Sequence, residues 1–88
     1  MITNPAIRLT SGLCLTLPPH ARHAQIVQLG LAVGLFELLD ETKFLRGFLN
    51  DEGTFCDREV AMLIAKDCGQ LLASADHSAI HLNTEMLW

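Results

Sequence analysis

The sequence is poor in positive charge. Its 88 residues contain six Lys and Arg against ten Asp and Glu, so the formal net charge is −4. Proteins that bind nucleic acid by neutralising phosphates carry a basic surface, so this composition predicts no direct nucleic-acid binding. Half of the residues are hydrophobic, which excludes intrinsic disorder, since disorder goes with low hydrophobicity and high charge. A chain of this length is typical of one domain, and we assign residues 1–88 to it.

The sequence also lacks a long apolar run. The longest one, residues 24–39, is shorter than the ~20 residues that a membrane span needs, and Gln25, Gln28 and Glu37 interrupt it. Residues 1–17 contain no basic segment followed by an apolar one, so this pattern predicts no secretory signal. We therefore expect a cytoplasmic protein that makes no membrane contact.

Cysteines are few and form no recognised pattern. Cys14, Cys56 and Cys68 are odd in number and far apart, which fits neither a disulfide framework nor a Cys-x-x-Cys metal site. Reduced thiols agree with a cytoplasmic protein. Strand alternation is expected to expose Cys14, and Cys68 lies near a predicted helix end, where fraying exposes side chains. Cys14 is therefore the first candidate for an exposed thiol and Cys68 the second. We predict that air oxidation gives a homodimer through an intermolecular disulfide of these thiols and that a reductant reverses it.

Local patterns in the first half predict a hairpin followed by a helix. Residues 6–10 and 13–17 alternate between apolar and polar side chains around Ser11-Gly12, which is typical of a β-hairpin. Pro18-Pro19 then ends the second strand, and a helix is predicted to start near His20. The apolar residues at helical spacing are Ile26, Leu29, Val33 and Phe36.

The second half predicts a strand, a tight turn and a helix. Residues 47–49 are the third strand, and the turn Asp51-Glu52-Gly53 returns the chain so that Phe55 lies beside it. Asp57 is the predicted N-cap of a helix from Arg58, and Gly69 is its C-cap. The predicted apolar face of this helix is Val60, Ile64, Cys68 and Leu71. With one short helix in residues 74–88, the prediction is an α+β fold: a small antiparallel sheet of about three strands packed with two to three helices.

The histidines come in two pairs, which raises the question of a metal site. His20 and His23 are three residues apart, and His77 and His81 are four apart, so either pair would share one face of a helix. No HExxH or Cys-x-x-Cys motif accompanies them, and polar surface or capping roles are the simpler interpretation. We therefore predict neither a metal nor a cofactor.

Catalytic motifs are missing as well. The sequence contains no GxxxxGK[ST] and no GxGxxG loop, so no phosphate-cradling turn is indicated. Cys56 and Cys68 have no base at a motif spacing, and packing is the more common role of such cysteines. We predict no catalytic residue and no enzymatic activity.

Acidic side chains gather in three places, at 40–41, 51–52 and 57–59. The plain interpretation is a solvated surface, because charged residues usually face water. The sharper hypothesis is an acidic surface that attracts a basic partner. Its predicted contact residues are Asp40, Glu41, Asp51 and Glu52.

Several short segments form a loosely spaced pattern. They are Ala21-Arg22-His23, Gly47-Phe48-Leu49, Gly53-x-Phe55-x-Asp57-Arg58-Glu59, Ala61, Ile64-Ala65, Gly69-Gln70 and Leu87-Trp88. This pattern resembles a widespread family of small phage and prophage proteins, and its block from 47 to 70 is the most specific part. The sequence departs from the family's usual residues at Ala24, Asn50 and Thr54.

This resemblance has a functional implication. Short phage proteins of this sort often counter host defences, and the size, acidity and element order look similar to those of type I-C anti-CRISPR proteins. Such proteins bind the crRNA-guided surveillance complex. The resemblance therefore implies a non-enzymatic inhibitor in the cytoplasm of the host cell. Its protein partner would be a type I CRISPR surveillance complex, whose recognition of target DNA it would block.

The alternative is a small metal- or ligand-binding protein of phage origin. Its cleft would lie where the third strand meets the two helices, and its residues would be Arg22, His23, Asp57, Arg58 and Gln70. The two hypotheses differ in what they need from the structure. An inhibitor of this kind needs a convex acidic surface, whereas ligand binding needs those five side chains to converge.

Overall fold

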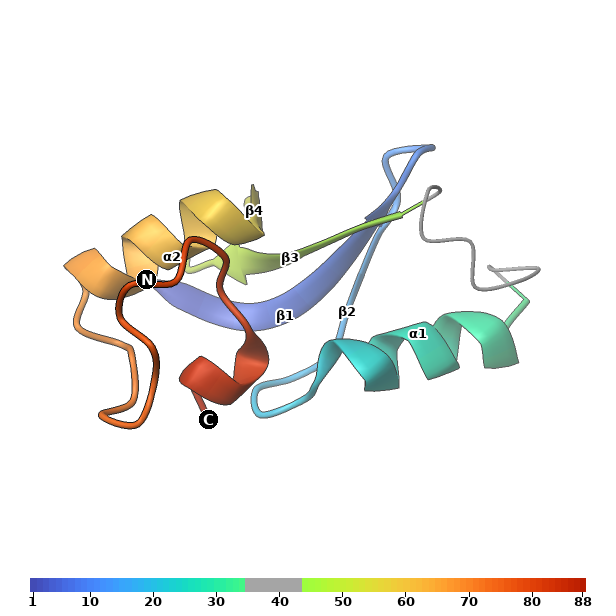
Figure 1. Cartoon of the computed structure of the whole chain (residues 1–88). Helices are drawn as coiled ribbons and strands as arrows, with labels where there is room; N and C mark the ends of the chain where they lie inside the picture. The colour runs from blue at the N-terminus through green and yellow to red at the C-terminus, as the bar shows by residue number, and fades with distance from the viewer. Residues whose placement is uncertain (35–43) are drawn as a thin grey trace.

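The computed structural model describes residues 1–34 and 44–88. They form an antiparallel sheet in the order β2-β1-β3-β4 (Figure 1). Its strands are β1 (Ile2–Leu9), β2 (Cys14–Thr16), β3 (Phe44–Asn50) and β4 (Phe55–Asp57). The helical elements are α1 (His23–Ala32), α2 (Arg58–Asp67) and the short 3₁₀ helix η2 (Thr84–Met86). The predicted α+β class is confirmed, with a four-stranded sheet where about three strands were expected.

The predicted N-terminal hairpin is present, and its first strand is longer than expected. Gly12 has a φ of +92°, a left-handed conformation that glycine adopts without strain, and it forms the turn between β1 and β2. β1 begins at Ile2 rather than at residue 6, so it includes Pro5, which lies opposite Phe48 of β3. A proline is tolerated in a sheet near a bulge, and the β1–β3 register shifts between Ile2 and Asn4.

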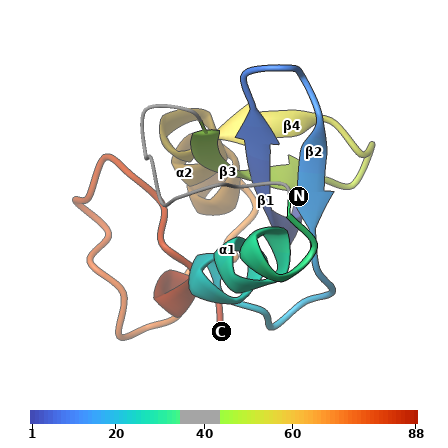
Figure 2. The same cartoon turned by 90° about the vertical axis from the view of Figure 1, so that its right-hand side faces the viewer.

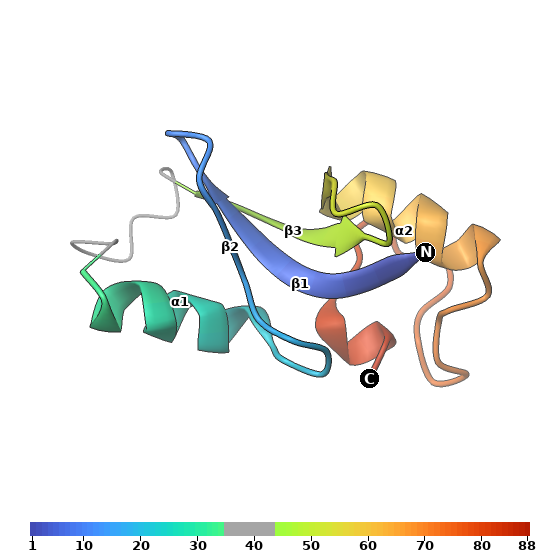
Figure 3. The same cartoon turned by 180° about the vertical axis from the view of Figure 1, so that it is seen from behind.

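The two α-helices lie at opposite ends of the sheet (Figure 1). α1 packs against β1 and β2, below the hairpin in the end-on view of Figure 2, and α2 packs against β3 and β4. Residues 68–88 lead from α2 back to the beginning of α1 (Figure 3). There the indole N–H of Trp88 donates to the carbonyl of Ala21 at 3.1 Å. In the described part of the chain, no helix has the length and apolar character of a membrane span.

The start and the buried face of α1 differ from the prediction. The helix begins at His23 rather than near His20, because His20 has a φ of 37°, which is outside the helical region. Ile26 is buried as predicted, but Leu29 and Val33 are exposed, and the other buried residues are Val27 and Gly30; the predicted Phe36 lies outside the described residues. Apolar side chains occur on every side of this helix, so their spacing did not define which face packs on the sheet.

Both predicted caps of α2 are confirmed, whereas its buried face is rotated. The Asp57 carboxylate accepts from the Val60 N–H at 2.9 Å, and Gly69 has a φ of +67°, the usual left-handed residue after a helix. The buried residues are Ala61, Met62 and Ala65. Of the predicted face, Ile64 and Leu71 are partly buried against the core, while Val60 and Cys68 are exposed. Small alanines let the helix lie close to the sheet, and for that reason they form its inner face.

The buried side chains form two separate cores along the sheet. The α2 core contains Ile2, Phe48, Cys56, Ala61, Met62, Ala65, Leu82, Met86 and Leu87. The smaller α1 core contains Ile7, Ile26, Val27 and Phe44. Phe44 and Phe48 both belong to β3, so this one strand runs from one core into the other.

Candidate ligand-binding cleft

The candidate site begins at the place where the two cores meet. Side chains alternate along a strand, so Phe44, Arg46 and Phe48 share one face of β3. Phe44 lies in the α1 core and Phe48 in the α2 core, which puts Arg46 between them. The Arg46 guanidinium carbon is 5.4 Å from the centre of the Phe44 ring. A half-buried arginine therefore occupies the junction between the two cores.

Two neighbouring cavities open at this junction and share Arg46 and Arg58. We call the first, of about 310 Å³, the arginine cavity. It lies between the start of α1, β3 and the C-terminal segment, and it is lined by Arg22, His23, Ala24, Arg46, Arg58, Asn83, Thr84 and Glu85. Volumes of this order are typical of sites for small molecules.

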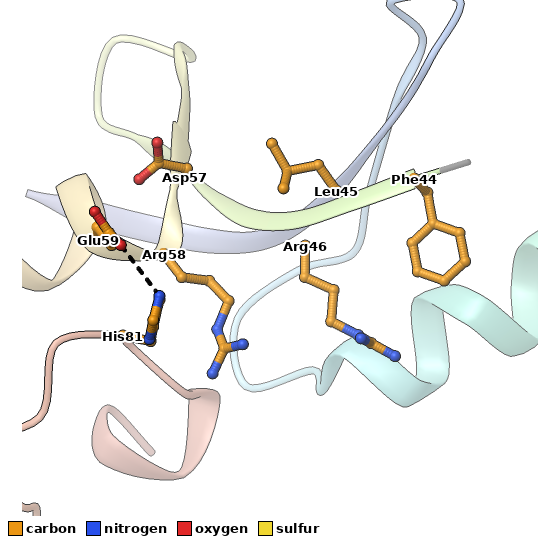
Figure 4. Close-up of a pocket in the computed structure, with 7 residues that line it drawn as sticks. All are labelled: Phe44, Leu45, Arg46, Asp57, Arg58, Glu59 and His81. Carbon is orange, nitrogen blue, oxygen red and sulfur yellow. Dashed lines mark ion pairs between the residues drawn. The ribbon is translucent and has the colours of Figure 1, made fainter. Parts of the chain in front are cut away.

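The second cavity, of about 470 Å³, is called the β3-edge cavity here. β4 pairs only with residues 47–49 of β3, and this cavity lies beside the preceding residues of that strand. Its lining residues are Phe44, Leu45, Arg46, Asp57, Arg58, Glu59 and His81. Figure 4 shows Arg46 and Arg58 extending to the same side of β3, while Leu45 and Asp57 point to the other side.

The arginine cavity concentrates the positive charge of an acidic protein. Three of the six basic residues in the whole sequence, Arg22, Arg46 and Arg58, line it. Within the described residues, Glu85 is the one carboxylate of its lining. Clefts lined by charge of one sign attract ligands of the opposite sign. The cavity is therefore suited to an anion, although the chain as a whole is negative.

The guanidinium groups of Arg58 and Arg22 differ in their hydrogen bonds. Arg58 Nε donates to the Leu82 carbonyl at 2.9 Å, and Arg58 Nη2 donates to the Asn83 side-chain oxygen. Arg22 Nη1 is buried and has no hydrogen-bond partner in the described part of the chain. A buried donor without a partner costs about 1–3 kcal/mol. Buried polar groups without a partner are uncommon in native proteins.

His23 connects α1 to the sheet beside these arginines. Its Nε2 lies 2.7 Å from the Gly47 carbonyl, so this nitrogen carries the proton and donates it, and the ring packs edge-on against Phe48 with centroids 5.0 Å apart. Burial lowers the pKa of His23 below its usual 6.5, and the charges of Arg58 and Arg46 lower it further, against the raising effects of the Gly47 bond and Glu85. His23 is therefore neutral at pH 7, and the arginines supply the positive charge.

The structure brings most of the predicted ligand residues to this junction. Arg22, His23 and Arg58 line the arginine cavity, and Asp57 lines the β3-edge cavity while its carboxylate caps α2. Gln70 is not brought there. Its side-chain amide accepts from the Ile2 N–H at 2.7 Å and donates to the Ile2 carbonyl at 2.8 Å. It joins the end of α2 to the first strand, which is a structural role.

The predicted acidic contact residues are placed in part. Asp51 and Glu52 are exposed at the tight turn between β3 and β4, and Asp51 lies 3.3 Å from the N-terminal amine. Ion pairs between exposed groups contribute little. Asp40 and Glu41 lie outside the described residues.

The cysteines are exposed in the reverse of the predicted order. Cys68 is exposed, whereas Cys14 is half-buried and Cys56 is buried. Burial raises the pKa of the Cys56 thiol, which leaves it protonated and unreactive at neutral pH. The intermolecular disulfide through Cys14 and Cys68 stays a prediction.

The histidine pairs do not share helix faces. His20 precedes α1 and packs against Trp88 with a centroid distance of 5.6 Å, and His77 and His81 lie in no helix. His81 Nε2 is 3.3 Å from a Glu59 oxygen. Among residues 1–34 and 44–88, no three His, Cys, Asp or Glu side chains form a group that would hold a metal ion.

Sequence reasoning missed Arg46 and the C-terminal lining residues. Arg46 had a recognisable signal, since it stands between Phe44 and Phe48 at positions that alternate toward one face of a strand. Asn83, Thr84 and Glu85 had none, because the segment before them has no periodic pattern. A hydrogen bond from the Leu82 N–H to the Arg58 carbonyl and the packing of Leu82 in the α2 core bring it to the cleft.

No curated protein and no solved structure gives a significant match to the chain. One protein-family model does match it, and this model is described as the Phage T4 y16D protein. The match covers residues 1–88 and therefore the arginine cavity and both cores. It agrees with the resemblance of the sequence to small phage proteins. The chain belongs to the Phage T4 y16D protein family.

Proposed function

We propose that this phage protein is a non-enzymatic ligand-binding protein whose arginine cavity binds an anionic group. The observation that carries the proposal is the convergence of Arg22, Arg46 and Arg58 from three separate segments on one cavity of a protein with net charge −4. Guanidinium groups bind carboxylates and phosphates through paired, charge-assisted hydrogen bonds. The placement of three of the few basic side chains in one cavity therefore favours binding of an anion there.

Two further features support anion binding. Arg22 Nη1 has no hydrogen-bond partner among the described residues, and an anion would accept from it after a small shift of the guanidinium toward the cavity. The cavity also includes His23 and Ala24 at the first turn of α1, where backbone N–H groups have no partner inside the helix. The positive end of the helix dipole favours negative charge at this position.

The experiment is thermal unfolding with phosphate, sulfate or citrate against chloride at the same ionic strength. Binding to the native state raises the unfolding temperature, and a ligand at 100 times its Kd stabilises by ~2.7 kcal/mol. We expect this stabilisation in the parent protein and its loss in Arg22→Gln. The matched control is Arg8→Gln, since Arg8 lies over the Phe55 ring away from the cavity and the change in charge is the same. Equal effects of all anions on parent and both variants would contradict the proposal.

Glu85 provides a second arm of the same test. Its carboxylate lines the arginine cavity and is exposed, so it repels an anion bound there. Replacing it with Gln should raise anion affinity a few-fold, because an exposed charge acts through water with modest strength. Glu52→Gln, at the β3–β4 turn, is the control with the same loss of charge. An unchanged anion affinity in Glu85→Gln would show that the anion does not bind in the arginine cavity.

The second candidate function is inhibition of a type I CRISPR surveillance complex through an acidic surface. The exposure of Asp51 and Glu52 on a turn supports it, since a turn tip presents side chains to a partner. The test is binding of the purified protein to a type I-C complex, with Asp51→Lys combined with Glu52→Lys. This candidate requires weaker binding after charge reversal and weaker binding of the parent at high salt. Absence of binding would remove it.

A further inference from the structure

We infer that the anion is the phosphate of a small phosphate monoester, with its organic part in the β3-edge cavity. This inference rests on the proposed function, because it names the ligand class of the same cleft. It follows from two observations: the arrangement of donors in the arginine cavity, and the room that adjoins it.

The donors in the arginine cavity match three oxygens better than two. A carboxylate has two oxygens, and one guanidinium satisfies both in a paired contact. Here Arg22 and Arg58 enter from different segments, at the start of α1 and the start of α2, and His23 and Ala24 of the first turn of α1 line the same cavity. A phosphate monoester has three terminal oxygens and a charge of about −1.5 to −2 at pH 7. Phosphates also bind at helix N-termini.

The orientation of Arg58 supports the same interpretation. Its Nε and Nη2 are engaged with Leu82 and Asn83, which fixes the plane of the guanidinium. Asn83 uses its side-chain oxygen in this contact and is itself a lining residue of the cavity. A fixed guanidinium loses little entropy when it binds an anion, and affinity gains from such preorganisation.

The space beyond the arginines indicates an organic part rather than a free ion. The β3-edge cavity of about 470 Å³ adjoins the arginine cavity at Arg46 and Arg58. A phosphate bound between Arg22 and Arg58 would therefore leave this neighbouring space for the group it is esterified to. The wall there includes the His81–Glu59 pair (dashed line in Figure 4), in which His81 Nε2 lies 3.3 Å from a Glu59 oxygen. Both side chains are suited to hydrogen bonds with hydroxyl groups.

The test is titration of the isotope-labelled full chain, followed by the backbone N–H signals of His23 and Ala24. The probes are inorganic phosphate, glucose 6-phosphate, uridine 5′-monophosphate, glucuronate and citrate. The two esters are separate arms because a sugar phosphate and a nucleotide are different sources of the same group. We expect at least one ester to bind ~3-fold or more tighter than inorganic phosphate and ~10-fold or more tighter than either carboxylate, a difference of about 1.4 kcal/mol.

Variants locate the effect. Arg22→Gln should weaken ester binding ~10-fold or more, whereas Arg8→Gln should change it less than about 2-fold, since charge-assisted bonds act at contact. Carboxylates binding as tightly as the esters would overturn the phosphate assignment and leave anion binding intact. Inorganic phosphate binding as tightly as both esters would overturn the role of the β3-edge cavity. Absence of binding by every probe would overturn the proposed function itself.

Discussion

The half of the molecule around α2 and the half around α1 share one sheet but are held together differently. α2 has a side-chain cap at its start and a glycine at its end, and residues 68–88 cover its core. At the start of α1 the Gln25 side chain accepts from the Arg22 N–H at 2.7 Å, whereas the core of α1 consists of only four buried residues. Its apolar residues Leu29, Leu31 and Val33 are exposed. Stability within one domain is not uniform, and the α2 half is expected to be the more stable.

This difference has a consequence for the cleft. Arg22 and His23 belong to the start of α1, whereas Arg58 and Asn83 belong to the α2 half and its C-terminal segment. A ligand that contacts both halves adds a connection between them. Binding would then stabilise the less stable half more than the other, because a ligand stabilises the structure that it requires.

The largest expected effect is the loss of stability when one buried side chain is truncated in each core. Met62→Ala in the α2 core and Ile26→Ala in the α1 core both truncate side chains that are almost fully buried, and each change should cost ~2–5 kcal/mol. We expect Met62→Ala to lower the unfolding free energy of the whole chain. Ile26→Ala should instead reduce protection from hydrogen exchange mainly in α1.

The measurement is chemical denaturation together with native-state hydrogen exchange resolved by residue. Met62→Ala should reduce protection in both helices, because unfolding of the α2 core removes the sheet on which α1 packs. Equal loss of protection in α2 for both variants would show that the two cores form a single cooperative unit and that the two halves do not differ in stability.

The second prediction concerns the close packing of the sheet at Gly47. A Cβ at this position would lie 2.4 Å from the Cys56 carbonyl and 2.4 Å from the Phe55 ring. The ring can move, whereas the carbonyl belongs to the β4 backbone. We expect Gly47→Ala to cost ~1–3 kcal/mol through overpacking and to disturb the nearby bond to His23.

The control for this variant is Gly53→Ala in the β3–β4 turn. Gly53 has a φ of +77° and open space around its Cα, so alanine there should cost only the ~1 kcal/mol of a left-handed residue. Denaturation curves of both variants check the order. A larger loss at Gly53 would mean that β4 yields readily and that the sheet is less rigid at this end than the geometry implies.

The sequence predicted the α2 half better than the α1 half. The caps at Asp57 and Gly69 were predictable because they are local chemistry of a few residues. The buried face of α1 was not predictable, since an evenly apolar helix acquires its orientation from the sheet. Phe36 and the acidic residues at 40 and 41 lie outside the described residues.

The sequence predicted some residues of the candidate site and misassigned one. Arg22, His23 and Arg58 stood in recognisable motifs, and their convergence on one cavity follows from the fold. Gln70 was in a motif too, but its amide is bonded to Ile2, 68 residues away in the chain. Such a long-range backbone contact leaves no local pattern, so a motif residue with a structural role looks the same as one with a binding role.

The third prediction tests the C-terminal connection between the two halves. The Trp88 indole donates to the Ala21 carbonyl at 3.1 Å, one residue before Arg22. Trp88→Phe removes this donor and should cost ~0.5–1.5 kcal/mol of stability. It should also weaken anion binding, because the start of α1 would be positioned less firmly against residues 83–85.

The matched control is Leu72→Ala, which trims a partly exposed side chain in the same C-terminal segment but keeps the indole bond. Thermal unfolding and phosphate titration of both variants give the comparison. Equal phosphate affinity in Trp88→Phe and the parent would show that the C-terminal residue contributes to stability alone and does not position the cleft.

The smallest predicted effect is a dependence of stability on pH through His23. Burial lowers its pKa in the folded state below the usual 6.5, so the unfolded chain binds the proton more readily. Stability from this residue is therefore fully present above pH ~6.5 and is lost as the pH falls toward and through the folded pKa.

The variant His23→Gln keeps an N–H donor for the Gly47 carbonyl and cannot titrate. The parent should thus lose more stability between pH 7 and 5 than His23→Gln, as measured by denaturation at each pH. His77→Gln, the same substitution at an exposed histidine, serves as the matched control. Equal slopes for the parent and His23→Gln would mean that His23 accepts a proton without leaving its position between α1 and the sheet. The junction of the two halves would then tolerate a positive charge on His23 despite the repulsion from Arg46 and Arg58.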